Sequence, residues 1–320
     1  MLHFITKKNY VINYRYLKLA LSLGVKLEKV NRVLQYDQSD FMAKYIMKNT
    51  NLRMQSKNEF EKDYYKLLNN SVFGKTMENV RNRINFRLIT TEDEAMRVKN
   101  LKRFTIFNKD LVGLHIQRTE IELNKPIYLG QNILDDSKAL MANFHYNFML
   151  KHVDRKNINL LMTDTDSFIY HIKKTDIFEI IKNNMDEFDL SDYPKDHELY
   201  NPKNKKVIGK FKNESIKQIT EFVGLRSKMY SFTVDGETKC KNRCKGIKSS
   251  VVKSEIKTKD YVNTLYTHEP KFVYQNGIRS YEHELYSETQ YKKALSCNDD
   301  KVYICDNNID TYSFGHYKII

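Results

Sequence analysis

The sequence contains no apolar run long enough to cross a bilayer, which takes about 20 mostly apolar residues. The apolar stretch nearest the N-terminus is interrupted by Lys18, so this region lacks the core of a secretory signal peptide. We therefore expect an intracellular, non-secreted protein without a membrane partner. Neither feature distinguishes the nucleus from the cytoplasm.

Cysteine is scarce as well. The four cysteines, Cys240, Cys244, Cys297 and Cys305, are too few and too scattered for a disulfide framework. Cys240 and Cys244 could begin a zinc site, but neither a second pair nor a His-x3-His follows nearby. We expect reduced thiols. No internal repeat or low-complexity linker divides the chain.

Positive charge and aromatic rings are abundant. The chain has 54 Lys and Arg against 40 Asp and Glu, which gives a formal net charge of +14. Tryptophan is absent, whereas 22 Tyr and 17 Phe are often interleaved with Lys and Arg. Such a composition suits neutralisation of phosphates combined with base stacking. An AT-rich genome would also enrich Lys and Tyr, so composition alone leaves nucleic-acid binding open.

Two aspartates, Asp164 and Asp166, lie between the apolar segments 158–162 and 168–172. An apolar run, a short polar turn and a second apolar run predict a β-hairpin with both acids at its tip. Residues two apart on an extended backbone face the same side, where they can bind one divalent ion. An ordinary acidic turn is the other interpretation, because aspartate favours turns.

A second pattern lies in a long helix predicted from about residue 59 to residue 81, with Ser56 and Glu59 as a capping box. One apolar face of this helix should face the core: Phe60, Tyr64, Leu67 and Leu68. The opposite face aligns two lysines with an amide and an aromatic ring: Lys62, Lys66, Asn70 and Phe73. A solvated basic face explains the lysines, but not the aligned amide and ring.

Residues 66–74 fit the pattern K-x3-N-S-x-[YF]-G and resemble motif B of the family B DNA polymerases. The acidic hairpin resembles motif C of that family, Y-x-D-T-D-S, with Met162 in place of the tyrosine. Lys228 and Tyr230 match the family's K-x-Y motif. The motifs follow the family's order. The chain thus resembles the C-terminal polymerase half of the protein-primed type, found in viruses and self-synthesising DNA transposons.

This resemblance implies an α+β fold, in which an antiparallel palm sheet with helices is joined by helical fingers and a C-terminal thumb. It implies template-directed DNA synthesis by two-metal nucleotidyl transfer, with Mg²⁺ or Mn²⁺ as cofactor. The implied partners are primer-template DNA, dNTPs and a terminal protein as primer.

Roles for single residues also follow from the resemblance. Asp166 would be the direct metal ligand, with Asp164 supporting it, and Lys66, assisted by Lys62, would bind the triphosphate. The other implied roles concern the nucleotide pocket (Asn70, Phe73), the approach of the template base (Gly74) and the primer end (Lys228, Tyr230). Lys245 and Lys248 would reach primer-template phosphates, although a solvated face explains these two nearly as well.

One motif of the family is missing. Motif A, D-x2-S-L-Y-P, carries the first catalytic aspartate and precedes motif B, but nothing before Lys66 fits it. The segment 189–194 is superficially similar, yet it follows motif C and is interpreted as a loop. We expect motif A and the exonuclease on an upstream segment or partner chain, and the isolated chain to be inactive or weakly active. The alternatives are an inactive, element-derived relic that binds DNA or nucleotide, and an unrelated basic scaffold.

The resemblance also divides the chain into a partial palm (1–38), fingers (39–83), palm (84–244) and thumb (245–320), with an insertion near 90–128. Helices are predicted at 14–23, 40–51 and 137–152, and extended segments at 25–34, 207–211 and 228–234. In the last helix we expect Leu140, Phe144, Phe148 and Leu150 to be buried.

Overall fold

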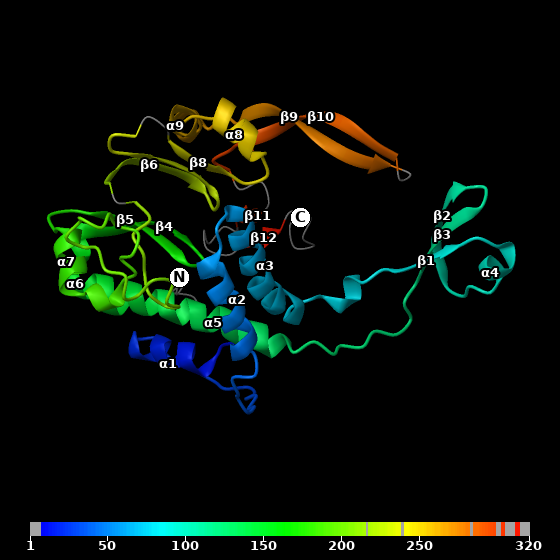
Figure 1. The fold of residues 1–320 in the computed structure, drawn as a ribbon, viewed down its shortest axis with the longest axis horizontal. Coiled ribbons are helices and arrows are strands. Elements are labelled where there is room, and N and C mark those ends of the chain that lie inside the picture. The colour runs from blue at the N-terminus through cyan, green and yellow to red at the C-terminus, as the bar shows by residue number, and fades with distance from the viewer. Residues whose placement is uncertain are drawn as a thin grey trace. The chain divides into compact units, whose positions relative to one another are not determined.

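The computed structural model describes residues 8–215, 217–237, 240–281, 284–298, 302–304 and 311–313. It combines helices with small antiparallel sheets (Figure 1), so the predicted α+β class is confirmed. The chain forms two compact units, residues 1–148 and 149–320, and their boundary falls inside the segment predicted as palm. No helix in the described part of the chain has both the length and the apolar character needed to cross a membrane.

Unit 1 is built from four longer helices: α1 (Tyr14–Ser22), α2 (Ala43–Gln55), α3 (Glu59–Thr76) and α5 (Ile127–Asn143). As predicted, α2 and α3 pack together, and Asn49 Nδ2 on α2 donates to Asn69 Oδ1 on α3 at 3.0 Å. The backbone N–H of Asn13 donates to Asp135 Oδ2 at 2.8 Å, which fixes the start of α1 against α5. Residues 25–34, predicted as extended, form neither a helix nor a strand.

Helix α3 starts where predicted, but its cap and its end differ. Asn58 is the N-cap, since its side chain accepts from the Glu61 N–H at 2.8 Å, whereas the Ser56 hydroxyl donates to a carbonyl of α2. The helix ends at Thr76, and residues 80–82 form a separate 3₁₀ turn. Asn79 caps that turn by accepting from the Arg81 N–H, so its side chain competes with helix continuation.

The prediction of the buried face of α3 was wrong. Phe60, Tyr64 and Leu67 are exposed, with Phe60 at 79%. The side that contacts α2 instead carries Asn69, whose amide bonds take the place of apolar packing. Hydrophobic periodicity predicted the helix, but the side that contacts α2 is the one that carries the Asn69 hydrogen bonds.

The helix predicted at 137–152 begins earlier, at Ile127, and continues as a π-helical segment (Phe144–Met149) and α6 (Leu150–His152). Its burial differs from the prediction: Leu140 is 40% exposed, and Phe144, Phe148 and Leu150 are half-buried. Asp135 and Met141 are buried instead, and Asp135 accepts a hydrogen bond from the backbone of Asn13 at the start of α1.

A small sheet lies between α3 and α5 in sequence, where an insertion was expected near 90–128. Its strands β1 (Asn85–Ile89), β2 (Leu101–Asn108) and β3 (Leu111–Ile116) pair in the order β1-β3-β2, and α4 (Glu92–Met96) follows β1. The sheet has its own small core, formed by Ile89, Leu114 and Ile116.

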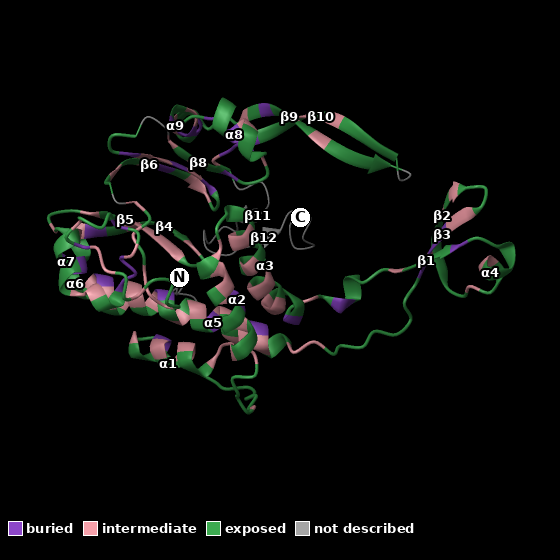
Figure 2. Ribbon diagram, in the orientation of Figure 1, coloured by how far each residue is buried: buried purple, intermediate pink, exposed green. Residues whose placement is uncertain are grey.

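In its described residues, unit 2 contains four small antiparallel sheets and four short α-helices. The strands are β4 (Ile158–Asp164), β5 (Ser167–Ile172), β6 (Ile219–Arg226), β7 (Met229–Val234), β8 (Lys241–Cys244), β9 (Lys271–Tyr281) and β10 (Glu284–Leu295), with a small pair β11 (Val302–Ile304) and β12 (Thr311–Ser313). The α-helices are α7 (Ile177–Asn183), α8 (Ser249–Glu255) and α9 (Thr258–Thr267), besides α6. Strands β4–β5, β6–β7–β8 and β9–β10 pair antiparallel, and most of β9–β10 is exposed (Figure 2).

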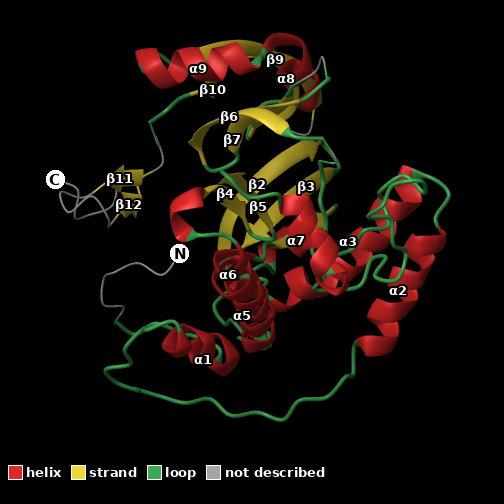
Figure 3. Cartoon of the chain, turned by 90° about the vertical axis from the view of Figure 1, so that its left-hand side faces the viewer, coloured by secondary structure: helices red, strands yellow, loops and turns green. Residues whose placement is uncertain are grey.

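The core of unit 2 lies between the β6–β7–β8 sheet and helices α8 and α9 (Figure 3). Tyr261 of α9 is fully buried, and its hydroxyl donates to the Arg243 carbonyl at 2.9 Å. Met229 on β7 and Leu295 on β10 are also buried there. The predicted strand at 228–234 is confirmed as β7. The predicted strand at 207–211 is wrong, since these residues form turns with one isolated bridge at Phe211.

The N-cap assignment can be tested by substitution. Asn58→Ala should lower the free energy of unfolding by about 1 kcal/mol, because the Glu61 N–H loses its acceptor. Ser56→Ala should cost less in the same chemical-denaturation measurement. A larger loss for Ser56→Ala would contradict the assignment.

Candidate functional site

The acidic motif forms the turn of the β4–β5 hairpin, as predicted. Asp164 pairs with Ser167, which leaves Thr165 and Asp166 as the turn. The Asp166 N–H donates to the Asp164 carbonyl at 2.6 Å, and Thr165 has a φ of 55°. Positive φ is unusual for a β-branched residue, and such backbone outliers cluster at functional sites. Because Asp166 lies in the turn, strand alternation does not determine its direction.

Lys228 lies in a second tight turn, between β6 and β7. Arg226 pairs with Met229, so Ser227 and Lys228 form this turn, and Lys228 has a φ of 58°. Its backbone carbonyl accepts the N–H of Lys245 at 3.1 Å. The pairing of β6 with β7 and this hydrogen bond from the residue after β8 thus hold the turn in place.

An ion pair joins the two turns. The Lys228 Nζ lies 3.1 Å from Asp164 Oδ1, and the two side chains keep 48% and 31% of their exposure. Water screens such a pair, so its contribution to stability is about 0–1 kcal/mol. The ion pair matters because of where it lies: it joins the lysine that matches the K-x-Y pattern to an aspartate that matches the motif C pattern.

The donor set at the hairpin tip suits a hard divalent ion. Mg²⁺ prefers carboxylate oxygens and is commonly held by one or two of them together with substrate phosphates. Among the described residues, Asp166 has no hydrogen-bond or ion-pair partner for its side chain, and no group of three or more His, Cys, Asp or Glu gathers. At Asp164, the Lys228 ammonium supplies the neutralising positive charge.

Tyr230 lies on an aromatic and basic face of the β6–β7–β8 sheet. Its ring stacks between Phe222, at 5.9 Å between centroids, and Phe232, at 6.3 Å. Lys241 and Arg243 are the cross-strand partners of Phe232 and Tyr230, so they share this face. Lys241 Nζ lies 5.7 Å from the Phe232 ring centroid.

The sequence analysis missed these neighbours of Tyr230. The period-two spacing of Tyr230 with Phe232 and of Lys241 with Arg243 was the available signal. Their meeting on one face depends on the pairing of β7 with β8, which the sequence does not specify.

Lys245 and Lys248 follow β8 and are both exposed. Lys245 lies beside the Lys228 turn through its backbone hydrogen bond. Lys248 is the N-cap residue of α8, and its N–H donates to Gln275 Oε1 at 3.1 Å. The two lysines therefore add positive charge near the end of β8.

The motif B residues lie along α3 in unit 1. Lys66 and Asn70 are exposed and Phe73 is half-buried, while Lys62 Nζ lies 2.6 Å from Glu59 Oε1. None of these side chains makes the α2–α3 contact through a described hydrogen bond. Of this line, Lys66 and Asn70 thus lie at the surface of unit 1, whereas Lys62 and Phe73 are partly covered.

Gly74 has no packing role in α3. A Cβ built at this position would meet no atom within 4 Å. Glycine inside a helix costs about 0.5–1 kcal/mol relative to alanine, so it is locally unfavourable here. Close approach of another molecule is a physical reason for glycine at such a position.

Three of the four cysteines lie in the described residues. Cys240, Cys244 and Cys297 are free thiols, and Cys305 lies outside the described residues. Burial raises the pKa of the Cys244 thiol to about 11, so this thiol stays protonated at neutral pH.

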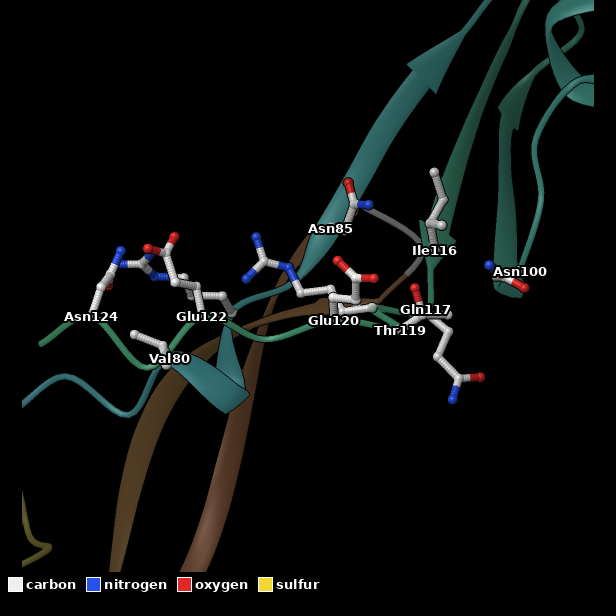
Figure 4. Close-up of a pocket in the computed structure, with 11 residues that line it drawn as sticks. Val80, Asn85, Asn100, Ile116, Gln117, Thr119, Glu120, Glu122 and Asn124 are labelled. Carbon is white, nitrogen blue, oxygen red and sulfur yellow. The ribbon is translucent and has the colours of Figure 1, made fainter.

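A separate pocket of about 490 Å³ lies at the base of the β1–β3–β2 sheet (Figure 4). Its lining mixes both charges with amides and includes Arg118, Glu120, Glu122 and Asn124. None of the predicted site residues lines it.

Comparisons of the chain with protein-family models, with curated proteins and with solved structures give no match. Function is therefore inferred from the motifs and from the geometry of their residues.

Gly74→Ala separates packing from binding. The substitution should raise the free energy of unfolding by about 0.5–1 kcal/mol, because the added methyl meets open space. It should also weaken primer-template binding if a template base approaches Gly74. Denaturation and fluorescence anisotropy give the two readouts, with exposed Asp63→Ala on the same helix as control. Unchanged DNA affinity would remove Gly74 from the site.

Proposed function

We propose that this chain supplies the nucleotide-, metal- and primer-binding residues for template-directed DNA synthesis of the family B type. The observation that carries the proposal is the ion pair between Lys228 and Asp164. These residues belong to two motifs that are far apart in sequence, and each motif was identified separately from its own pattern.

Polymerase chemistry gives this proximity a physical meaning. During nucleotidyl transfer, the primer 3′-oxygen must lie beside the metal that activates it. A lysine that holds the primer end must therefore lie close to the metal-binding carboxylates. The 3.1 Å pair meets this requirement within unit 2 alone.

The residues of the chain then have distinct tasks. Bound divalent ions would lower the pKa of the primer hydroxyl and stabilise the leaving pyrophosphate, and Asp166 and Asp164 are the residues that would hold them. With such an ion at Asp164, Lys228 would no longer be needed to neutralise that carboxylate, and its ammonium would be free to pair with a primer phosphate. Tyr230 positions the primer end from the adjoining aromatic face.

Motif B supplies the nucleotide side of the proposal. Lys66 pairs as a point charge with the triphosphate, and Lys62 assists one turn earlier on the helix. Phe73 forms the floor under the sugar, with Asn70 beside it on the same helical face. The exposed setting of Lys66 and Asn70 supports this assignment.

A DNA-binding relic is the second candidate. The absence of the motif A pattern before Lys66 in this sequence favours it, because a shared metal ligand is then missing from these residues. Loss of even supporting residues around a metal commonly costs about 10–100-fold in activity or affinity. A working site should bind dNTPs only when Mg²⁺ or Mn²⁺ is present, and Lys66→Ala should abolish that binding. A relic that binds only DNA should show no dNTP binding, and its DNA affinity should be the same with and without EDTA.

The purified chain should bind primer-template DNA with strong salt dependence and extend the primer little or not at all. Lys228→Ala should weaken DNA binding several-fold. It should also reduce the slope of log K against log[salt] by about one, because one phosphate contact is lost. Lys173→Ala, at the other end of the β4–β5 hairpin, is the matched control. Fluorescence anisotropy across a salt series gives the affinities, and gel analysis gives the extension.

Some results would contradict the primer site at Lys228, and another would contradict the expected lack of activity. Salt-insensitive binding, or equal losses for the two lysine variants, would argue against a primer site at Lys228. Robust Mg²⁺-dependent extension that Asp166→Ala abolishes would show that these residues suffice without motif A.

A further inference from the structure

The connection between α1 and α2 contains a stretch that pairs with no strand, residues 25–35, which we call the connecting segment (Figure 3). It contains no helix, turn or bend, and each of its residues is exposed. The backbone groups of residues 26–35 form no hydrogen bond with any described residue. Five of its side chains are nevertheless apolar: Val25, Leu27, Val30, Val33 and Leu34. Strand-forming side chains and an unpaired backbone are the features of an edge strand that lacks a neighbour.

The connecting segment is held at both ends by helices of unit 1. At its start, the Val25 N–H donates to the Ala20 carbonyl of α1 at 3.1 Å. Just after its end, the Tyr36 hydroxyl accepts from Asn132 Nδ2 on α5, and the Tyr36 ring lies 5.4 Å from that of Tyr128 between centroids. Because the ends are fixed and the stretch between them is already free of turns, a partner strand has less chain to order on binding.

The charges of the connecting segment fit a second copy of the same segment. Glu28 is its one acidic residue, and neither Glu28 nor Arg32 has an ionic or hydrogen-bond partner among the described residues. The two lie on opposite sides of Val30, each two residues away. When two copies pair antiparallel and centred on Val30, Glu28 of each copy therefore faces Arg32 of the other. A two-fold axis repeats this contact, so the dimer contains two such ion pairs.

The same register also avoids contacts between like charges. Leu27 of one copy faces Val33 of the other, and the two lysines of the segment face the uncharged residues Leu34 (from Lys26) and Asn31 (from Lys29). Centring the pairing on Lys29 instead would place Lys26 opposite Arg32, where like charges repel. Facing apolar pairs and opposite charges both stabilise antiparallel strands, so the sequence favours the register centred on Val30.

We propose that the connecting segment pairs with the connecting segment of a second copy of the chain, as antiparallel strands of a two-fold symmetric dimer. An unpaired extended backbone is a template for another strand, and pairing two copies supplies donors and acceptors to both. The apolar side chains of each copy then lie beside those of the other. This surface lies outside the polymerase motifs, so the proposal goes beyond the function proposed above.

The test uses the full chain in analytical ultracentrifugation over a concentration series, where a monomer–dimer equilibrium is expected. Glu28→Arg and Arg32→Glu should each weaken dimerisation by about tenfold, because two facing pairs become like-charged. The double variant Glu28→Arg/Arg32→Glu exchanges the charges and should restore most of the affinity. Asp63→Arg, at an exposed position of α3, is the matched control, because it changes the net charge as Glu28→Arg does and should leave dimerisation unchanged.

A synthetic peptide of residues 25–35 gives a second readout. It should dissociate the dimer by pairing with the connecting segment, whereas a peptide of the same composition in scrambled order should not. A chain that stays monomeric up to its solubility limit, or a double variant as weak as the single ones, would overturn the proposal. So would an equal loss in Asp63→Arg, because net charge rather than facing residues would then control association. Equal competition by the two peptides would also overturn it.

Discussion

The contact between Lys228 and Asp164 sets the geometry on which the candidate site depends. It is half exposed, and a pair of this kind adds little to the free energy of folding. It fixes instead where two backbone turns meet, each with a residue of positive φ, Thr165 and Lys228. Local backbone strain is tolerated when the surrounding structure determines it, and here both turns end well-paired antiparallel strands.

The supporting structure behind the Lys228 turn is the core of unit 2. Met229, the residue after Lys228, is buried against the same cluster as Cys244 and Tyr261. On alternating positions, Tyr230 faces the other side of the sheet with the aromatic neighbours. One strand thus anchors the fold with one side and presents the candidate primer-binding residues with the other, as the period of two requires.

In helix α3, polar hydrogen bonds rather than apolar packing mark the side that contacts α2. Its contact with α2 includes amide pairs such as Asn49–Asn69, which satisfy buried polar groups and select one register. At the surface of unit 1 lie Lys66 and Asn70, together with the apolar side chains Phe60 and Leu67, whereas Lys62 and Phe73 are half-buried.

Local periodicity and turn chemistry predicted the acidic hairpin, the helices α2 and α3 and strand β7. The α+β class and the pairing of α2 with α3 were predicted from the family resemblance. The sequence did not determine the buried face of α3 or the extent of the helix at Ile127, since contacts with other elements decided both. The strand expected at 207–211 failed for the same reason: a short apolar run forms a strand only where a partner strand is available.

At the site, the sequence identified Asp164, Asp166, Lys228 and Tyr230, because each belongs to a pattern with fixed spacing. Only the tertiary structure brought Lys228 to Asp164, because their contact joins two turns that belong to separate strand pairs. The aromatic face around Tyr230 likewise arises from the β6–β7–β8 register. Sequence patterns specify which residues can act, whereas strand pairing decides which of them meet.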